Sequence, residues 1–355
     1  MTQIIEQIRS ASSVQKTDAF LIQSGINRRY VTGFTGTAGA VLITEKRAFF
    51  ITDFRYTKQA EDQVKGFEIV EQKGLLLDTV ASIIEEEGVK SIGFEKDHVT
   101  YTQFEQLQEK LSCELVPVSG LIEELRMKKS GQEIDVIQEA VDIADRAFDH
   151  IQAYIRPGAR EIDISNELEF FMRREGAVSS SFDIIVASGW RSALPHGVAS
   201  TKQIGQGELV TLDFGAYYQG YCSDITRTVA VGEPDSGLRS IYDTVHQAQL
   251  TCLEGLKPGI TGIEADALAR DYITEKGYGR YFGHSTGHGM GMEVHEGPGL
   301  SFRSSKKLEP GHVVTVEPGI YIEDTGGTRI EDDVVITEEG CRILSRSTKE
   351  LLILE

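Results

Sequence analysis

Residues 209–231 read LVTLDFGAYYQGYCSDITRTVAV, and this stretch carries two acidic residues, Asp213 and Asp224. They lie in β-branched and aromatic runs on either side of a Gly-containing turn, which is the pattern of a β-hairpin. Aspartate is depleted in strands, so a carboxylate inside such an apolar run is unusual. The stretch therefore predicts a hairpin that carries a pair of functional carboxylates.

A second acidic hairpin follows at residues 313–337, VVTVEPGIYIEDTGGTRIEDDVVIT, with Glu317 and Glu331 in matching places. His288 lies between the two hairpins, in the glycine-rich segment HSTGHGMGMEVHEGPG. If the hairpins meet, four carboxylates and an imidazole come within reach of one another. Adjacent buried carboxylates repel, and one of them protonates unless a cation is present.

A pair of divalent metal ions is the simplest cation that such a cluster could hold. Two such ions can activate a water and polarise a carbonyl group. Carboxylates with one imidazole and no thiolate suit manganese, cobalt, iron or zinc better than a soft metal. The ligand types do not choose among these four, and manganese is the ion that we expect first. His284 and His288 are four residues apart, but glycines interrupt the segment and it has no H-E-x-x-H motif, so a helical zinc-protease site is not expected.

The chain is expected to contain two domains, 1–128 and 129–355. In the first, strand-like runs such as AVLITEK alternate with helical patterns such as DTVASIIEEEG, which indicates an α/β layer. In the second, two helices precede each acidic hairpin. This repeated order predicts an α+β domain whose halves are related by a pseudo-twofold axis, with the acidic side chains meeting between them.

Composition and charge argue against several classes of partner and location. A net charge of −19 argues against a nucleic-acid partner and against docking on an anionic membrane. The sequence has no signal-peptide pattern and no apolar run of the roughly 18–20 residues that would span a bilayer. The four cysteines are isolated and are expected to be structural thiols. We expect a cytoplasmic protein.

The order Asp, Asp, His, Glu, Glu in these motifs resembles the pita-bread metallopeptidases, and NRRYVTGFTGTAG and FITDFRYTKQA resemble the creatinase/prolidase-type N-terminal domain. The resemblance is closest to Xaa-Pro aminopeptidases and Xaa-Pro dipeptidases. It implies an α/β N-terminal domain, an α+β pita-bread catalytic domain and a homodimer. The metal ligands that it implies are Asp213, Asp224, His288, Glu317 and Glu331.

The resemblance also implies roles around the metals. His196 would contact substrate near the scissile bond, His295 would hold the tetrahedral intermediate, and Glu317 would shuttle a proton. His284 would line the pocket for the proline ring. Arg329 matches an arginine of the proline-cleaving branch, and it could instead form a salt bridge that orients Glu331 or its neighbour.

The favoured function is an aminopeptidase P-like enzyme that cleaves the Xaa-Pro bond at the N-terminus of proline-containing peptides. An Xaa-Pro dipeptidase, or prolidase, is the alternative, and a metal-free pita-bread binding protein is a third possibility. Methionine aminopeptidases usually lack such an N-terminal domain, and creatinase lacks this ligand set, so neither is expected.

Overall fold

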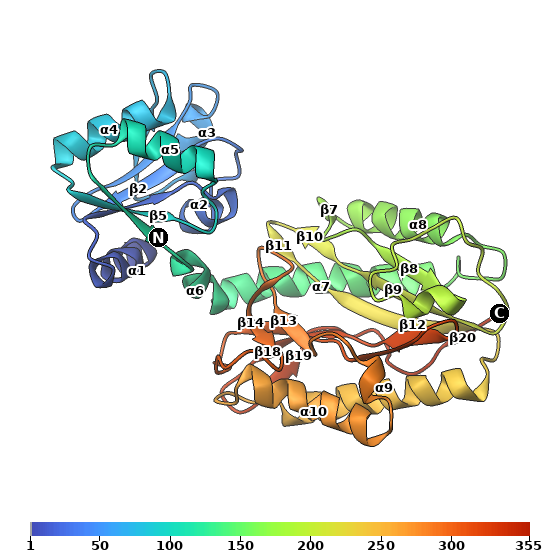
Figure 1. Cartoon of the computed structure of the whole chain (residues 1–355). Coiled ribbons are helices and arrows are strands. Elements are labelled where there is room, and N and C mark those ends of the chain that lie inside the picture. Colours follow the sequence, from blue (N-terminus) through green and yellow to red (C-terminus); the bar gives the residue numbers. More distant parts are fainter. Residues whose placement is uncertain (1) are drawn as a thin grey trace. The chain divides into compact units, whose positions relative to one another are not determined.

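The computed structural model describes residues 2–355, and the chain divides into two compact units, Met1–Arg126 and Met127–Glu355 (Figure 1). Each unit contains both helices and strands. The expected combination of an α/β N-terminal domain with an α+β pita-bread domain is confirmed by this architecture and by the similarities reported below.

The first unit is built on a mixed sheet. Its strands are β1 (Ala19–Ile22), β2 (Ala40–Thr44), β3 (Ala48–Thr52), β4 (Glu68–Glu71), β5 (Ser91–Glu95) and β6 (Glu114–Val118). They form six neighbouring strands in the order β4-β3-β2-β1-β5-β6. The pairs β1–β2 and β2–β3 are antiparallel, and the remaining pairs are parallel.

Helices cover both faces of this sheet. They are α1 (Thr2–Val14), α2 (Gly25–Thr32), α3 (Thr57–Gln63), α4 (Leu76–Glu87), α5 (Tyr101–Lys110) and α6 (Leu121–Met127). Side chains alternate along a strand. Phe20 and Ile22 of β1 therefore pack in one core with α1, α2, α3 and α6, whereas Ala19 and Leu21 pack in a second core with α4 and α5.

The second unit repeats a helix, helix, hairpin order. Its helices are α7 (Gly131–Ile151), α8 (Glu161–Arg174), α9 (Ser236–Gly255) and α10 (Gly262–Glu275), with 3-10 turns η1 (Gly189–Ala193) and η2 (Gly279–Tyr281). Its strands are β7 (Ser179–Ser180), β8 (Ile185–Ser188), β9 (Glu208–Phe214), β10 (Ala216–Tyr218), β11 (Tyr221–Cys222), β12 (Ile225–Val231), β13 (Gly287–Gly289), β14 (Glu296–Leu300), β15 (Val313–Val316), β16 (Gly319–Ile322), β17 (Gly326–Arg329), β18 (Asp332–Ile336), β19 (Cys341–Ile343) and β20 (Ile353–Leu354).

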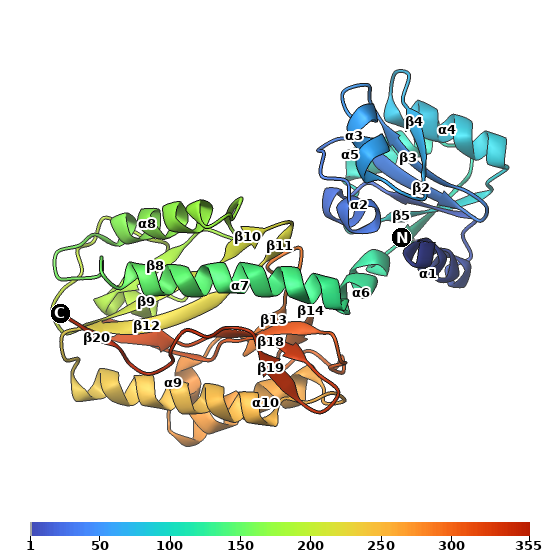
Figure 2. The ribbon, with the colours of Figure 1, turned by 180° about the vertical axis from the view of Figure 1, so that it is seen from behind.

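The two acidic hairpins are central in their sheets. The antiparallel pair β9–β12 belongs to the sheet β20-β12-β9-β8, and the antiparallel pair β15–β18 belongs to β14-β13-β15-β18-β19. Helices α7 and α8 lie on one side of these strands and α9 and α10 on the other (Figures 1 and 2). Each helix pair shares a buried apolar core with its own hairpin, so the space between the hairpins is left for polar groups.

Local sequence sets the helices that hold this frame. Ser130 and Glu133 form a capping box at the start of α7, with Glu133 N–H donating to Ser130 Oγ over 3.3 Å. Ile137, Ala140 and Ala144 then recur at three- and four-residue steps and are buried.

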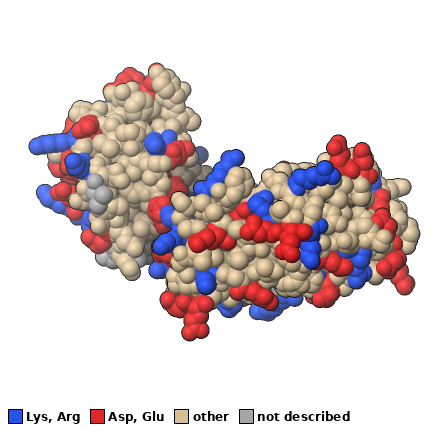
Figure 3. All heavy atoms as spheres, turned by 60° about the horizontal axis from the view of Figure 1, so that its bottom comes forward, with Lys and Arg blue, Asp and Glu red and all other residues tan. Residues whose placement is uncertain are grey.

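On the surface, Figure 3 shows Lys and Arg side chains scattered among Asp and Glu on the face that it displays.

Buried polar contacts join the two hairpins. Glu331 N–H donates to Thr226 O over 3.1 Å. The Arg227 guanidinium contacts Glu331 O and pairs with Asp332 at 2.7 Å, and both of these side chains are almost completely buried. This ion pair joins β12 to the segment that carries Glu331. Asp332 also pairs with Lys349 at 2.5 Å and accepts from Gln249 Nε2 over 2.7 Å, so its buried charge has two cations.

We expect Arg227→Met to lower the free energy of unfolding by about 2–3 kcal/mol, because Asp332 keeps Lys349 but loses its second cation, and the buried oxygens of Glu331 and Ser347 lose a charged donor. Urea denaturation measures the loss. The control is Arg239→Met, which removes an exposed pair with Asp243 and should cost less than about 1 kcal/mol. Equal losses in the two variants would contradict the structural role of the buried pair.

Candidate metal and catalytic site

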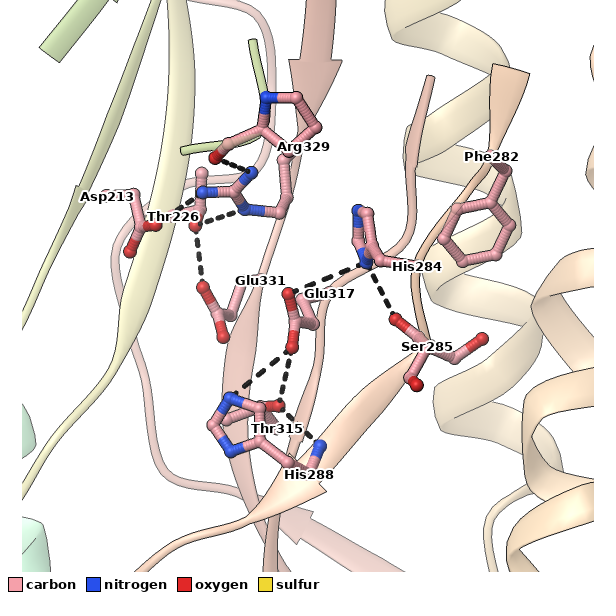
Figure 4. A network of polar contacts seen from close by, with 12 residues as sticks. Asp213, Thr226, Phe282, His284, Ser285, His288, Thr315, Glu317, Arg329 and Glu331 are labelled. Atoms are coloured by element: carbon pink, nitrogen blue, oxygen red, sulfur yellow. Dashed lines mark hydrogen bonds and ion pairs between the residues drawn. The ribbon is translucent and has the colours of Figure 1, made fainter. Parts of the chain in front are cut away.

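The four acidic side chains come from the ends of the two hairpins, and Figure 4 shows three of them, Asp213, Glu317 and Glu331. Asp213 lies in β9 and pairs in register with Thr226, while Asp224 immediately precedes β12. Glu317 immediately follows β15, and Glu331 immediately precedes β18. The hairpins therefore bring together acids that are as far apart in the sequence as Asp213 and Glu331, which are separated by 118 positions.

Asp224, His288 and Glu331 form the densest part of the cluster. Each offers one ligand atom, and these atoms all lie within 4.8 Å of one another. His288 Nε2 is 3.7 Å from Asp224 Oδ2 and 3.4 Å from Glu317 Oε1. His288 Nδ1 donates to Gly289 O over 3.1 Å, which places the ring proton on Nδ1 and leaves the Nε2 lone pair facing the carboxylates.

Burial and mutual repulsion dominate the electrostatics of these acids. Burial, reinforced by the charges of Glu331 and Asp213, raises the pKa of Asp224 well above its usual value. Burial, together with the charges of Glu317 and Asp213, does the same to the pKa of Glu331. Burial also raises the pKa of Glu317, although His284 and Arg329 oppose the shift. Without a further cation the cluster is driven to take up protons.

The residues present fit divalent cations. The Oδ1 atoms of Asp213 and Asp224 are buried and have no hydrogen-bond partner among the described residues. An unpartnered buried carboxylate oxygen is costly, and a metal ion is one of the few groups that would satisfy it. Carboxylates with one imidazole lone pair form a hard donor set that suits manganese, cobalt, iron or zinc.

Arg329 bonds directly to one acid of the cluster and indirectly to a second. Its Nη2 forms an ion pair with Asp213, its Nε donates to Thr226 Oγ1 over 3.0 Å, and Thr226 Oγ1 in turn donates to Glu331 Oε2 over 2.6 Å (Figure 4). The guanidinium pairs with Asp213 and not, as the alternative prediction had it, with Glu331 or its neighbour. Arg329 therefore orients one metal-site carboxylate directly and a second one through Thr226.

A directed hydrogen-bond chain runs from Arg329 to His284. Arg329 Nη1 donates to Tyr321 Oη over 2.9 Å, and Tyr321 Oη lies 2.8 Å from His284 Nε2. His284 Nδ1 lies 2.8 Å from Ser285 O, an acceptor, so Nδ1 carries the proton and Nε2 accepts from Tyr321. Both ring nitrogens of His284 are thus used within the protein, and only its ring surface remains for contact with a ligand.

A cavity of about 590 Å³ opens over the cluster. His196 and His295 are exposed residues in its wall, and the rings of His295 and His288 have centroids 4.3 Å apart. The structure thus brings every residue singled out from the sequence to one cavity. Its further lining residues are Phe182, Asp183, Ile185, Pro195, Val198, Ser285, Gly287, Val294, Gly299 and Ser301.

Sequence reasoning missed Tyr321 as a member of the site. Tyr321 lies in VEPGIYIED, four residues after Glu317, and reads as an ordinary strand aromatic. Nothing in the local pattern predicts that its hydroxyl links Arg329 to His284. The face shared by Asp224 and Thr226 was a usable signal, because alternation along β12 points both side chains towards Glu331.

The raised carboxyl pKa values predict how stability depends on pH and metal. Above about pH 4, the unfolded chain loses carboxyl protons that the metal-free native cluster still binds, so metal-free stability falls as pH rises through the raised native values. The double variant Asp224→Asn, Glu331→Gln lacks the part of this loss that Asp224 and Glu331 cause. We expect the metal-free wild type to be less stable than the variant at pH 8, with a smaller gap at pH 5. Manganese should reverse the order at pH 8.

Urea unfolding of chelator-treated protein, with and without manganese, measures these differences. Comparison with the variant cancels the opposing contribution of the histidines, whose pKa values burial lowers. A wild type that is already the more stable protein without metal at pH 8 would contradict the prediction.

Comparison with known proteins finds Xaa-Pro peptidases that are similar to the whole chain. The chain is 40% identical to an Xaa-Pro dipeptidase of Pyrococcus horikoshii, over 99% of both chains. It is similar to the structure of an Xaa-Pro dipeptidase from Bacillus anthracis, with 59% identity, 99% coverage of both chains and a TM-score of 0.99. It is also similar to the structure of an X-Pro aminopeptidase from Thermotoga maritima, with 42% identity, 96% and 98% coverage and a TM-score of 0.91.

No helix among residues 2–355 combines the length and the apolarity that a membrane crossing requires. The creatinase/prolidase N-terminal domain matches residues 4–128, and metallopeptidase family M24 matches residues 135–338, which contain all five expected metal ligands. The chain therefore belongs to metallopeptidase family M24 and is a hydrolase that carries a creatinase/prolidase-type N-terminal domain.

Proposed function

We propose that this metallopeptidase uses two divalent ions, manganese first, to hydrolyse the Xaa-Pro bond at the N-terminus of peptides. The observation that carries the proposal is the convergence of one imidazole lone pair and four buried or half-buried carboxylates on a single cavity. In this proposal the metal ligands are Asp213, Asp224, His288, Glu317 and Glu331. A homodimeric state and a cytoplasmic location belong to the same proposal.

The proposed roles divide the ligands between the ions. Asp213 would hold one ion and His288 the other, while Asp224 and Glu331 would be shared by both. When bound, the ions would lower the pKa of a water towards about 7 and polarise the scissile carbonyl. The buried cluster favours this arrangement, because two divalent charges offset four carboxylates that otherwise repel one another.

Proton transfer falls to Glu317. Its carboxylate is one of the groups that line the cavity, so it could take a proton from the attacking water and pass it to the leaving group. As the C–N bond breaks, the proline nitrogen becomes a secondary amine and must gain that proton. His196 and His295, in the cavity wall, can donate N–H groups to the carbonyl oxygen as it becomes negative.

Recognition of proline must use shape, because its amide nitrogen carries no hydrogen. The ring surface of His284 is free to contact a substrate, since both of its nitrogens are used within the protein. Phe282 packs edge-on against His284, with ring centroids 5.1 Å apart, and holds that surface in place. These features support an apolar contact between His284 and the proline ring.

The charges around the cavity favour peptides longer than a dipeptide. A dipeptide presents its free carboxylate next to proline and needs a cation there. Among the described residues that line the cavity, Arg329 is the only Lys or Arg. Its guanidinium already contacts Asp213, Thr226, Tyr321 and Pro195 O. We therefore propose an aminopeptidase P-like specificity, in which peptides longer than a dipeptide are the preferred substrates.

The dipeptidase remains the second candidate. It is favoured by the names of the Bacillus anthracis and Pyrococcus horikoshii proteins, which are similar to this chain over almost its whole length. A metal-free binding protein is the third candidate, and the presence of four carboxylates and one imidazole lone pair in the cavity argues against it.

We expect manganese-loaded protein to cleave an Xaa-Pro-Xaa peptide, and Asp224→Asn to lose about 10³-fold or more in kcat/KM. This loss corresponds to about 4 kcal/mol of transition-state stabilisation. The matched control is Asp243→Asn, which makes the same charge change at an exposed position of α9 and should leave activity unchanged. No cleavage of any Xaa-Pro peptide with any of the four metals would favour the binding protein.

A second assay separates the two peptidase specificities. We expect an Xaa-Pro dipeptide whose C-terminus is amidated to be cleaved with about tenfold higher kcat/KM than the free acid, because an unpaired carboxylate in the cavity costs about 1–3 kcal/mol. An Xaa-Pro-Xaa tripeptide should behave like the amide. A higher kcat/KM for the free acid than for its amide would assign the enzyme to the dipeptidases.

A further inference from the structure

Residues 189–200 form one wall of the cavity, and we call this segment the rim loop. It begins with the 3-10 turn η1 after β8, and Pro195, His196 and Val198 line the cavity. The loop has exposed apolar side chains, with Trp190 53% and Val198 50% exposed. The start of the loop is packed against β17, where Ser192 is buried and its Oγ accepts from Gly327 N over 2.9 Å. The part that carries His196 is more exposed, so its position depends on further contacts.

A single buried carboxylate accepts hydrogen bonds from both ends of the rim loop. Glu161, the first residue of α8, is fully buried. Its Oε1 accepts from Ser188 N at 2.8 Å and from Ser188 Oγ at 2.9 Å, just before the loop. Its Oε2 accepts from Ser200 N at 3.1 Å and from Ser200 Oγ at 2.6 Å, at the end of the loop.

Arg191 extends this anchor into the middle of the loop. Its Nη1 forms an ion pair with Glu161, and its Nη2 donates to Val198 O over 2.9 Å. The far side of the loop is bonded to the metal site, because Pro195 O accepts from Arg329 Nη1 over 3.1 Å. His196 therefore lies between two bonded points, one traced to Glu161 and the other to Arg329.

Hydrogen bonds to a charged acceptor are stronger than those between neutral groups, and five of them meet on Glu161. Glu161 does not line the cavity, so its effect on a substrate can only be indirect. The other direct bonds of Arg329 bring it to the metal ligand Asp213, to Thr226 and to Tyr321. Glu161 and Arg191 contact none of these residues. The anchor therefore acts on the wall of the cavity and not on the metal ligands.

We propose that Glu161, with Arg191, is a positioning residue that holds the rim loop so that His196 meets the substrate, an inference that rests on the proposed function. Without the carboxylate, both loop ends lose their shared acceptor and the loop samples other positions. A displacement of about 1 Å at a substrate-contacting group can cost about 10²-fold in rate. Glu161→Gln should therefore lower kcat/KM by about that factor, with metal content unchanged.

A double-mutant cycle with His196→Ala tests whether Glu161 acts through His196. If it does, Glu161→Gln in the His196→Ala background should lower kcat/KM by less than about threefold, because the group that it positions is already gone. If the two losses multiply, Glu161 acts independently of His196 and the proposal is overturned. The control is Asp163→Asn, in the same first turn of α8, whose exposed pair with Arg160 does not reach the loop.

The fluorescence of Trp190 provides a readout that does not require activity. It is the only tryptophan of the chain and lies within the rim loop. We expect Glu161→Gln to lower its anisotropy and to increase its quenching by acrylamide, whereas Asp163→Asn should change neither. Unchanged anisotropy and quenching in Glu161→Gln would overturn the anchoring even if no peptide substrate had been found. Failure of the proposed function is thus distinguishable from failure of this inference.

Arg191→Met keeps the proposal testable if Glu161→Gln does not fold. It removes the bond to Val198 O but leaves the four bonds from Ser188 and Ser200 to Glu161. We expect a smaller loss of kcat/KM than in Glu161→Gln, partial rescue by Arg191→Lys, and the same lack of further effect in the His196→Ala background. Wild-type activity and wild-type Trp190 fluorescence in Arg191→Met would exclude Arg191 from the anchor.

Discussion

Repulsion among four carboxylates in one cavity is the constraint on which the rest of the structure depends. Burial alone raises the pKa values of Asp224 and Glu331, and each further carboxylate nearby raises them more. Only a fold that surrounds the cluster with rigid, well-bonded strands can hold these groups together. The two hairpins meet this demand, because each is packed on its outer side against a helix pair and directs its polar side chains inward.

The polar contacts around the cluster have two different structural roles. Arg227 and Asp332 join the two hairpins, so they determine whether the ligands meet at all. Arg329 then orients Asp213 and, through Tyr321, the ring of His284. These buried cations offset part of the negative charge, but each is already paired with groups of the protein. The front of the cluster is left to divalent ions, in keeping with a family M24 hydrolase.

Sequence predicted the parts of this account that depend on local pattern. The helix, helix, hairpin order and the acids within apolar strands follow from periodicity and composition, and the fold prediction was confirmed. The motif order predicted the family, also confirmed, whereas the individual site roles stay predictions. The partners of Arg329 and the hub at Glu161 were not predictable, because they depend on contacts between residues about 30–130 positions apart. A buried glutamate at the start of a helix reads locally as an ordinary N-terminal acid.

Titration of manganese into chelator-treated protein, in two buffers with different enthalpies of ionisation, tests the central claim most directly. Metal ions must displace the protons that a buried carboxylate cluster holds in their absence. The account predicts two ions bound per chain, with net release of protons at neutral pH and the loss of that release in the Asp224→Asn, Glu331→Gln variant. Absence of manganese binding, or binding without proton release, would contradict it.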